Sequence, residues 1–335
     1  MKKKIIFICE ADIEIGFGHL NRINNLAKSF FSKGYQCYLF GVKKKYVSNN
    51  YYKEIYSKNL FDEDEVNLYY LRKKIVSNNF FLVIDNFNIN VKIQKILKKN
   101  KIKWLQFDNL NKKNKKIYAD IIVNANPIVK KKEYSKILFD KKKQTLLLGM
   151  KYMIIRDEFK LKHESQRKKI LICSGGGVKD NGFLIFVTSF LLRNFKHLKL
   201  IIILKKNDLR EKVIIKLNKG TNNIQIIRDT SVISKYFSQS KIAIISGGTI
   251  LLESLFFKIH RIIFSTAENQ KKNSQAWNKL SYASYLGNIN KKKKELEFKF
   301  KEKITYFLAV NNAKKLKKNL INGKERIVKK ILTIL

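Results

Sequence analysis

The sequence has few cysteines, few histidines and no long apolar run. Its three cysteines, Cys9, Cys37 and Cys173, are an odd number, lie far apart and include no CxxC pair, so they indicate neither a disulfide framework nor a zinc site. A reducing cytoplasm is therefore expected. No stretch approaches the roughly 18 apolar residues that span a bilayer. The apolar run near the N-terminus ends at Glu10 after about five residues, which is too short for a signal-peptide core.

Acidic residues are also scarce, and the chain is strongly basic. Its 71 Lys and Arg residues stand against 26 Asp and Glu, a formal net charge of +45. Such an excess usually indicates nucleic acid or an anionic membrane surface as a partner. Here the lysines lie in short clusters along the whole chain, and no nucleic-acid-binding motif accompanies them. We therefore favour lysine-rich solvated faces over a nucleic-acid footprint, and expect any membrane contact to be peripheral and electrostatic.

The length and the apolar content predict two packed domains. Hydrophobic residues make up 45% of the 335 residues, and this length suits two cores of about 150 residues each. Residues 4–9 read as a buried strand, 20–31 as a helix with one apolar face, and 35–41 as a second strand, which is a βαβ unit and implies a parallel sheet. A second series of strands and helices begins at residue 169. The sequence thus predicts two doubly wound α/β domains, at 1–159 and 168–335, with a polar linker at 160–168.

A glycine-bearing turn follows the first strand, at Ile15-Gly16-Phe17-Gly18-His19. A strand that turns directly into a helix leaves unpaired backbone N–H groups that suit an anion. His19 is the only one of four histidines that closely spaced glycines flank. Because a helix N-terminus disfavours the imidazolium, we expect His19 to be neutral and to act as a catalytic base.

Several carboxylates are candidates for orienting the second nitrogen of His19, namely Glu10, Asp12 and Asp85. Acidic or amide residues close three predicted strands, because Asp85, Asp108 and the pair Asn124 and Asn126 follow apolar runs. The carboxyl ends of strands line the ligand crevice in open α/β sheets, so these residues are second-tier site candidates. An ordinary role in turns and caps is about as probable for each of them separately.

Two glycine-rich turns in the second half each follow a buried strand and precede a helix. They are Ser174-Gly175-Gly176-Gly177 and Ser246-Gly247-Gly248-Thr249. Together they could bring N–H groups to a diphosphate, although glycines that only permit close packing explain either turn alone. Neither turn matches the dinucleotide or P-loop pattern, so a nicotinamide cofactor or an ATP site is not supported. Glu253 shares a helix face with Thr249 and could accept hydrogen bonds from the vicinal hydroxyls of a ribose. An ordinary exposed glutamate is the alternative.

An ordered series of segments resembles one family of enzymes, the nucleotide-sugar hydrolases of pseudaminic acid biosynthesis (PseG). This family is similar to the MurG glycosyltransferase and has its GT-B fold, two Rossmann-like domains that face a cleft. The matching segments are IGFGH at 15–19, LVIDNF at 82–87, FDN at 107–109, ADIIVNANP at 119–127, GMKYMIIRDEF at 149–159, ICSGGG at 172–177, SGGTILLES at 246–254 and NQKKNSQAW at 269–277.

The resemblance implies hydrolysis of a UDP-linked diacetamido-trideoxyhexose to the free sugar and UDP. Water would attack the anomeric carbon with inversion, with His19 as the base, and neither a metal nor a cofactor would be needed. The turn at Gly16 and Gly18 would face the sugar, and the second domain would hold UDP. The residues implied for UDP are the main chain near Ile227 for uracil, Ser246, Gly247, Gly248 and Thr249 for the diphosphate, Glu253 for the ribose, and Asn269 and Gln270 near the sugar or the phosphates.

One departure from the family pattern bears on the sugar. The family commonly has an Arg-x-Asp-x-Ser stretch before the IGxGH turn, whereas this chain has Ile8-Cys9-Glu10-Ala11-Asp12. The identity of the hexose therefore stays open. Two alternatives to the hydrolase also remain, a GT-B glycosyltransferase that uses the same UDP-sugar donor and, ranked well below it, a basic nucleic-acid-binding protein.

Overall fold

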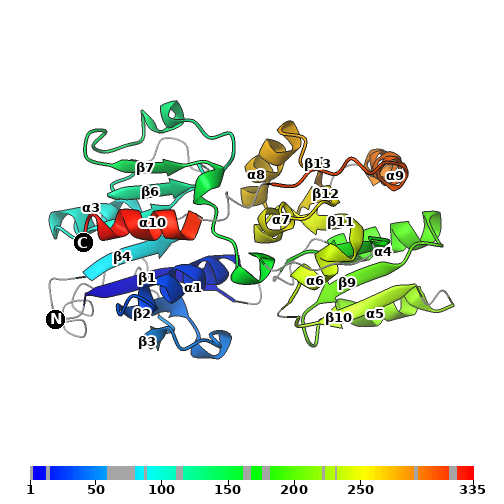
Figure 1. Cartoon of the computed structure of the whole chain (residues 1–335), viewed down its shortest axis with the longest axis horizontal. Coiled ribbons are helices and arrows are strands. Elements are labelled where there is room, and N and C mark those ends of the chain that lie inside the picture. The colour runs from blue at the N-terminus through cyan, green and yellow to red at the C-terminus, as the bar shows by residue number, and fades with distance from the viewer. Residues whose placement is uncertain are drawn as a thin grey trace. The chain divides into compact units, whose positions relative to one another are not determined.

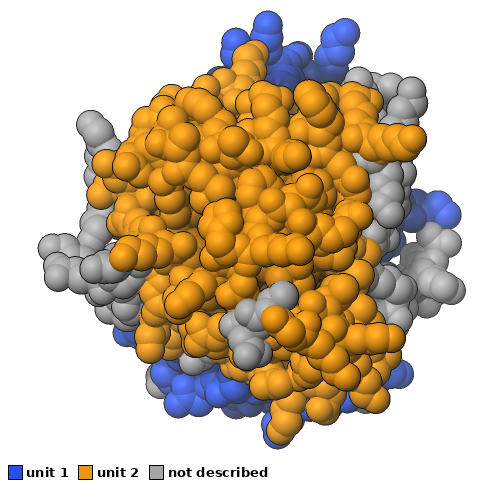
Figure 2. Space-filling model, turned by 90° about the vertical axis from the view of Figure 1, so that its right-hand side faces the viewer, with its two compact units in different colours: residues 1–155, 319–335 blue, residues 156–318 orange. Residues whose placement is uncertain are grey.

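The first strand predicted from the sequence lies inside a seven-stranded sheet in a computed structural model of the chain (Figure 1). The structure describes residues 3–12, 16–58, 80–86, 89–110, 116–160, 167–175, 182–220, 223–230, 232–289, 293–316 and 323–335. The chain divides into two units, coloured separately in Figure 2. Unit 1 contains residues 1–155 and 319–335, and unit 2 contains residues 156–318.

The sheet of unit 1 has the order β3-β2-β1-β4-β5-β6-β7, and all its pairings are parallel. Its strands are β1 (Lys4–Ala11), β2 (Gln36–Val42), β3 (Tyr52–Tyr56), β4 (Phe80–Asp85), β5 (Trp104–Phe107), β6 (Ile121–Asn124) and β7 (Thr145–Leu148). The helices of this unit are α1 (Gly18–Phe31), α3 (Val91–Lys99) and α10 (Gly323–Leu332), with short 3-10 helices η1 (Lys44–Tyr46), η2 (Lys131–Tyr134) and η3 (Met150–Tyr152).

Helices cover both faces of this sheet, which explains why β1 is a continuous apolar run. Ile5 and Phe7 pack in one cluster with side chains of α1 and α10, whereas Ile6 and Ile8 pack in another with side chains of α3. Parallel strands covered on both faces have no polar side, so their sequence does not alternate. The local pattern and the observed layers therefore agree.

The C-terminal helix α10 packs in unit 1, whereas the sequence analysis placed residues 168–335 in one domain. Figure 1 shows α10 (red) alongside α1, and Ile327 and Ile331 join the α1 side of the core. A Cβ atom on Gly323 would lie 2.1 Å from the carbonyl oxygen of Met153, so the start of α10 lies directly against the η3 segment. The apolar stripe of a helix shows that it packs, but not on which sheet.

Unit 2 holds a six-stranded sheet in the order β10-β9-β8-β11-β12-β13, again with parallel pairings. Its strands are β8 (Lys169–Cys173), β9 (Leu200–Leu204), β10 (Ile224–Arg228), β11 (Ser240–Ser246), β12 (His260–Ser265) and β13 (Ser284–Asn288). The helices are η4 (Asp157–Lys160), α4 (Phe183–Asn194), α5 (Arg210–Asn218), α6 (Ser234–Ser238), α7 (Thr249–Ser254), α8 (Glu268–Lys279) and α9 (Lys293–Ala309). The prediction of two successive doubly wound α/β halves is confirmed.

Candidate active site

Each sheet has a point at which the strand order reverses, and the predicted site turns lie there. In unit 1, β1 pairs with β2 on one side and with β4 on the other. In unit 2, β8 pairs with β9 and with β11 in the same way. Ligands of open α/β sheets bind at the carboxyl ends of the strands beside such a reversal. The turns after β1, β8 and β11 are therefore the candidate site of each unit.

His19 lies in the first turn of α1 and contacts a buried carboxylate. Its Nδ1 atom is 2.8 Å from Oδ1 of Asp85, the last residue of β4. Cys9 and Asp85 are paired across β1 and β4, which brings the end of β4 beside the helix that follows β1. A carboxylate at Nδ1 holds the proton there and leaves the Nε2 lone pair to accept one. Among the three carboxylates expected from the sequence, the structure places Asp85 in this orienting position.

Arg22 completes this group, and the sequence analysis did not single it out. Its Nε and one terminal nitrogen each donate to an oxygen of Asp85 at 2.6 Å, and its guanidinium lies 4.5 Å from the centre of the Phe107 ring. Burial alone would raise the pKa of Asp85, but Arg22 and His19 more than offset it and lower the pKa from 3.8 to about 2. Asp85 therefore stays ionised near neutral pH.

The spacing of His19 and Arg22 is the sequence signal that could have identified Arg22 as a site residue. They are three positions apart on α1, so both side chains project from one face of the helix. Arg22 also lies just after the IGFGH segment, in the sequence IGFGHLNR. Its partner Asp85 is 63 residues away in the sequence, and only the pairing of β1 with β4 brings the two together.

The other site residues predicted near the first turn lie in or beside it. Gly16 has φ near +89° and donates its N–H to the carbonyl oxygen of Asp12 at 2.9 Å, which closes the turn. Gly18 begins α1, and Glu10 accepts a hydrogen bond from the side chain of Asn86 at 3.0 Å. Residues 13–15 lie outside the described residues.

The second-tier candidates at the ends of β5 and β6 form a separate network. The Tyr134 hydroxyl donates to Asp108 at 2.7 Å and accepts from the Asn124 amide at 2.9 Å. The Asn124 side chain also accepts from the backbone N–H of Asn126. These contacts tie loops together, as the turn-and-cap interpretation expects.

The two glycine-rich turns of unit 2 lie against each other. Cys173 and Ile245 are paired across β8 and β11, and the Ser246 hydroxyl donates to the carbonyl oxygen of Ser174 at 2.8 Å. Gly175 has φ near +92°, a conformation that favours glycine. Gly176 lies outside the described residues. The turns thus lie side by side, as a common ligand would require.

Helix α8 packs closely on the second of these turns. A Cβ atom on Gly247 would lie 2.0 Å from the Ser274 hydroxyl, so close packing is one reason for this glycine. Asn273, which the sequence analysis did not assign, donates to the carbonyl oxygen of Gly247 at 3.2 Å. Asn269 is exposed in the first turn of α8, and Gln270 accepts from the backbone N–H of Thr266 at 3.0 Å.

Gly248, Thr249 and Ile227 are the remaining residues predicted to contact the nucleotide. Gly248 precedes α7, and Thr249 is the first residue of that helix. Ile227 lies in β10, which is an edge strand of its sheet and pairs with β9 on one side only. The main chain of an edge strand carries N–H and C=O groups that no neighbouring strand uses.

Glu253 is buried and has a specific partner. It is 2% exposed, and its two oxygens accept from Nε and a terminal nitrogen of Arg156 at 2.6 and 2.8 Å. Arg156 also pairs with Glu158 at 2.8 Å and lies over the ring of Phe159. Burial raises the pKa of Glu253, and Arg156 counteracts that rise. Glu253 is therefore not an ordinary exposed glutamate, and each of its oxygens keeps a second acceptor site.

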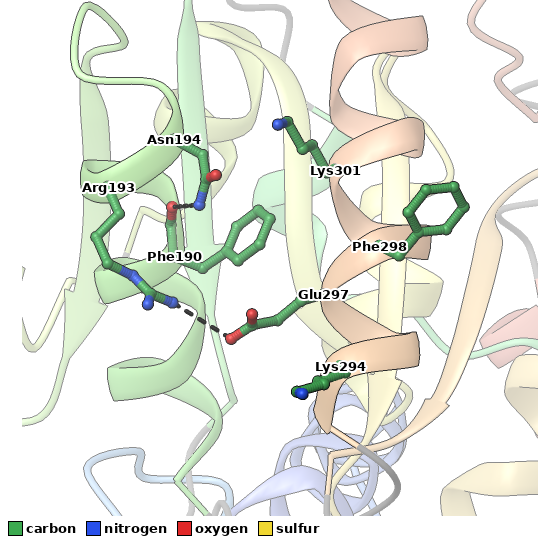
Figure 3. Close-up of a pocket in the computed structure, with 7 residues that line it drawn as sticks. All are labelled: Phe190, Arg193, Asn194, Lys294, Glu297, Phe298 and Lys301. Carbon is green, nitrogen blue, oxygen red and sulfur yellow. Dashed lines mark hydrogen bonds and ion pairs between the residues drawn. The ribbon is translucent and has the colours of Figure 1, made fainter.

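A surface pocket of about 360 Å³ lies between α4 and α9 (Figure 3). Arg193 and Glu297 face each other across it at 3.2 Å, and Lys294 and Lys301 also line it. Arg193 is near the end of α4, so this pocket lies toward the amino ends of the strands and away from the glycine-rich turns.

Among the described residues, no group of three or more His, Cys, Asp or Glu side chains could hold a metal. No described helix is long and apolar enough to cross a membrane.

Comparisons of the sequence gave two relatives, and no family model matches the chain. The chain is 26% identical over 303 residues to the UDP-2,4-diacetamido-2,4,6-trideoxy-beta-L-altropyranose hydrolase of Campylobacter jejuni, a match that covers 89% of this chain and 100% of that protein. It is also 26% identical over 305 residues to an uncharacterized protein of Methanocaldococcus jannaschii, where the match covers 86% of this chain and 59% of the relative.

Solved structures with the same fold include glycosyltransferases. MurG of Acinetobacter baumannii superposes with a TM-score of 0.64 at 12% identity and covers 99% of both chains. The Medicago truncatula protein UGT71G1, complexed with UDP-glucose, superposes with a TM-score of 0.60 at 11% identity and covers 98% of both chains. The expected resemblance is therefore confirmed: this chain has the GT-B fold and is similar over most of its length to a UDP-diacetamido-trideoxyhexose hydrolase.

Proposed function

We propose that this protein hydrolyses a UDP-linked diacetamido-trideoxyhexose to the free sugar and UDP, in the cytoplasm, as a step of pseudaminic acid biosynthesis. The observation that carries the proposal is the contact between His19 and the buried, ionised Asp85 at the end of β4. The similarity to a hydrolase of this kind along 89% of the chain supports the substrate class.

The proposed reaction uses His19 as a general base. Nε2 takes a proton from water, the water oxygen forms a bond to the anomeric carbon, and the bond from that carbon to the diphosphate oxygen breaks. The bonding electrons leave with UDP, and the configuration at the anomeric carbon inverts. Asp85 stabilises the imidazolium that forms on His19, and Arg22 holds Asp85 in place.

The proposed nucleotide site belongs to unit 2. The Ser246–Thr249 turn, with Gly175 and Gly176, would hold the diphosphate and the charge that develops on it, so that no strong general acid is required. The N–H of Gly247 already donates to the carbonyl oxygen of Phe264 at 3.1 Å, so Gly248 and Thr249 would supply the N–H groups of this turn. The main chain near Ile227 would bind uracil, and Glu253 would accept hydrogen bonds from the ribose hydroxyls. Asn269 and Gln270 would contact the sugar or the phosphates. Glu10 and Asp12, which replace part of the usual family stretch, would contact the sugar.

A glycosyltransferase is the second candidate, because the fold neighbours include glycosyltransferases. Incubation of the purified chain with a panel of UDP-diacetamido sugars in ¹⁸O-labelled water separates the two. We expect UDP release without any acceptor and one ¹⁸O atom in the anomeric hydroxyl of the free sugar. Release of UDP that begins only when an acceptor sugar or lipid is added would contradict the hydrolase.

Replacing Glu253 with glutamine tests the proposed ribose contact. Because a carboxylate accepts stronger hydrogen bonds than an amide, we expect UDP to bind about 10-fold more weakly, measured by titration calorimetry. The preference for UDP over 2′-deoxy-UDP should also be lost. Glu158→Gln is the matched control, since Glu158 pairs with the same arginine but is not assigned to the ribose. An unchanged preference in Glu253→Gln, with normal thermal unfolding, would remove Glu253 from the nucleotide site.

A further inference from the structure

The outward face of α5 combines aliphatic and cationic side chains. Leu209, directly before the helix, is 84% exposed, and Val213 and Ile215 are 45% and 47% exposed. Within α5 only Ile214 is a buried apolar residue. Single exposed apolar residues are normal on a protein surface, but here three lie within seven residues, two of them on α5 and Leu209 just before it.

Lysines occupy the centre of this face. At 100° per residue, Lys212, Lys216 and Lys219 lie between Ile215 on one side and the pair Leu209 and Val213 on the other. The sequence 210–219 contains four cations and one carboxylate, Glu211. That carboxylate is paired with Arg228, on β10. We name this surface, Leu209, Lys212, Val213, Ile215, Lys216 and Lys219, the α5 face.

Among the described residues, the carboxylates next to α5 do not neutralise the α5 face. Asp208 is buried and pairs with Arg210, and Asp229 lies 3.7 Å from Lys205. The acidic groups next to the helix are thus matched by cations other than the three lysines of the face. The surface is therefore positive and apolar at once.

The positive charge and the apolar side chains of the α5 face together indicate the class of partner. A second copy of the chain would bring like charges together, which opposes self-association through this face. Single-stranded nucleic acid would need aromatic side chains for stacking, and the α5 face has none. An anionic bilayer satisfies both requirements, because lysines attract its headgroups while aliphatic side chains enter the boundary with the acyl chains.

We propose that the α5 face docks unit 2 reversibly on an anionic lipid surface. This inference does not depend on the proposed hydrolysis. Helix α5 follows β9 and runs back from its carboxyl end, so only the start of the α5 face, at Leu209 and Lys212, lies near the edge of the sheet that carries the glycine-rich turns. The contact is peripheral, since only side chains of one short helix enter the boundary.

Cosedimentation of the full chain with vesicles tests the proposal. We expect binding to phosphatidylcholine vesicles that contain about 30% phosphatidylglycerol, which makes the surface anionic. We expect little binding to pure phosphatidylcholine vesicles. Lys212→Gln with Lys216→Gln should weaken binding about 25-fold, at about 5-fold per lysine. Leu209→Ser with Val213→Ser should weaken it about 10-fold without changing its salt dependence.

A control changes one exposed apolar and one cationic side chain on another helix of unit 2. It combines Phe298→Ser, at a residue that is 73% exposed on α9, with Lys301→Gln. This variant should bind vesicles like the wild type if the α5 face is the docking surface. All variants change exposed side chains, so their thermal unfolding should match that of the wild type.

Three outcomes would overturn the proposal. Equal weakening in the α9 control would indicate attraction by the overall charge of the chain. Wild-type binding in both α5 variants would exclude the α5 face. A vesicle-free dimer in analytical ultracentrifugation that Leu209→Ser with Val213→Ser dissociates would assign the surface to a second copy.

Discussion

Replacing His19 with asparagine is expected to lower turnover of the UDP-sugar about 1,000-fold, because a positioned general base contributes roughly this much. Asparagine keeps a polar side chain at the N-terminus of α1 but cannot take a proton from water. UDP affinity should stay nearly unchanged, since the proposed nucleotide contacts belong to unit 2. Turnover is measured as UDP release, and affinity by calorimetry.

Asp85→Asn should reproduce much of this loss, because an amide no longer holds the Nδ1 proton of His19 in the required tautomer. Arg22→Lys should give a smaller loss, since lysine cannot donate to both Asp85 oxygens in the bidentate geometry of arginine. Asp108→Asn is the matched control, a carboxylate at the end of another strand that contacts Tyr134. More than about a tenth of wild-type turnover in His19→Asn would exclude His19 as the base.

Replacing Arg261 with methionine is expected to destabilise unit 2 by about 3–5 kcal/mol, because several buried oxygens lose their donor at about 1–3 kcal/mol each. Arg261 is 1% exposed and lies in β12. Its guanidinium donates to the Ser254 hydroxyl and to the carbonyl oxygens of Ile259, Tyr282 and Lys314 at 2.9 to 3.2 Å, and to those of Ser254 and Phe257 at 2.5 Å. It thus joins the end of α7 to three other segments.

Methionine fills much of the same volume but leaves several buried carbonyl oxygens without donors. Because α7 carries Glu253, UDP binding should weaken as well. Urea unfolding measures the change, and Arg193→Met is the control. Arg193 is 62% exposed and pairs with Glu297 at 3.2 Å, so its loss should cost less than about 1 kcal/mol. A loss below about 1 kcal/mol in Arg261→Met would contradict this role.

The buried strands and the amphipathic helices were predictable, because their signals are local. The run at residues 4–9 and the apolar face at 20–31 correspond to β1 and α1. Strands β3, β7 and β13 were not predicted from the sequence. β3 and β13 form sheet edges and contain no fully buried residue, and only Leu147 is buried in β7, so none of them needs a continuous apolar run.

The candidate site was predictable in its turns but not in its pairings. Glycines next to predicted strand ends marked the turns at Gly16, Gly175 and Gly247, since a sharp strand-to-helix connection has a local signature. Arg156 and Asn273 have no comparable signature, and Arg22 is marked only by its spacing from His19. Arg156 meets Glu253 across 97 residues of sequence, and such a contact depends on which strands and helices become neighbours.

The sequence by itself determined that this protein has two parallel α/β halves with a histidine and two glycine-rich turns at strand ends. Tertiary structure alone decided that Asp85 contacts His19, that Arg22 pairs with Asp85, that Arg156 pairs with Glu253 and that α10 packs in unit 1. The physical reason is the distance along the sequence over which each signal acts. Periodicity, glycine turns and apolar runs act over a few residues, whereas the order of strands in a sheet brings together side chains that are 60 to 100 residues apart, on the order of two to three βα units.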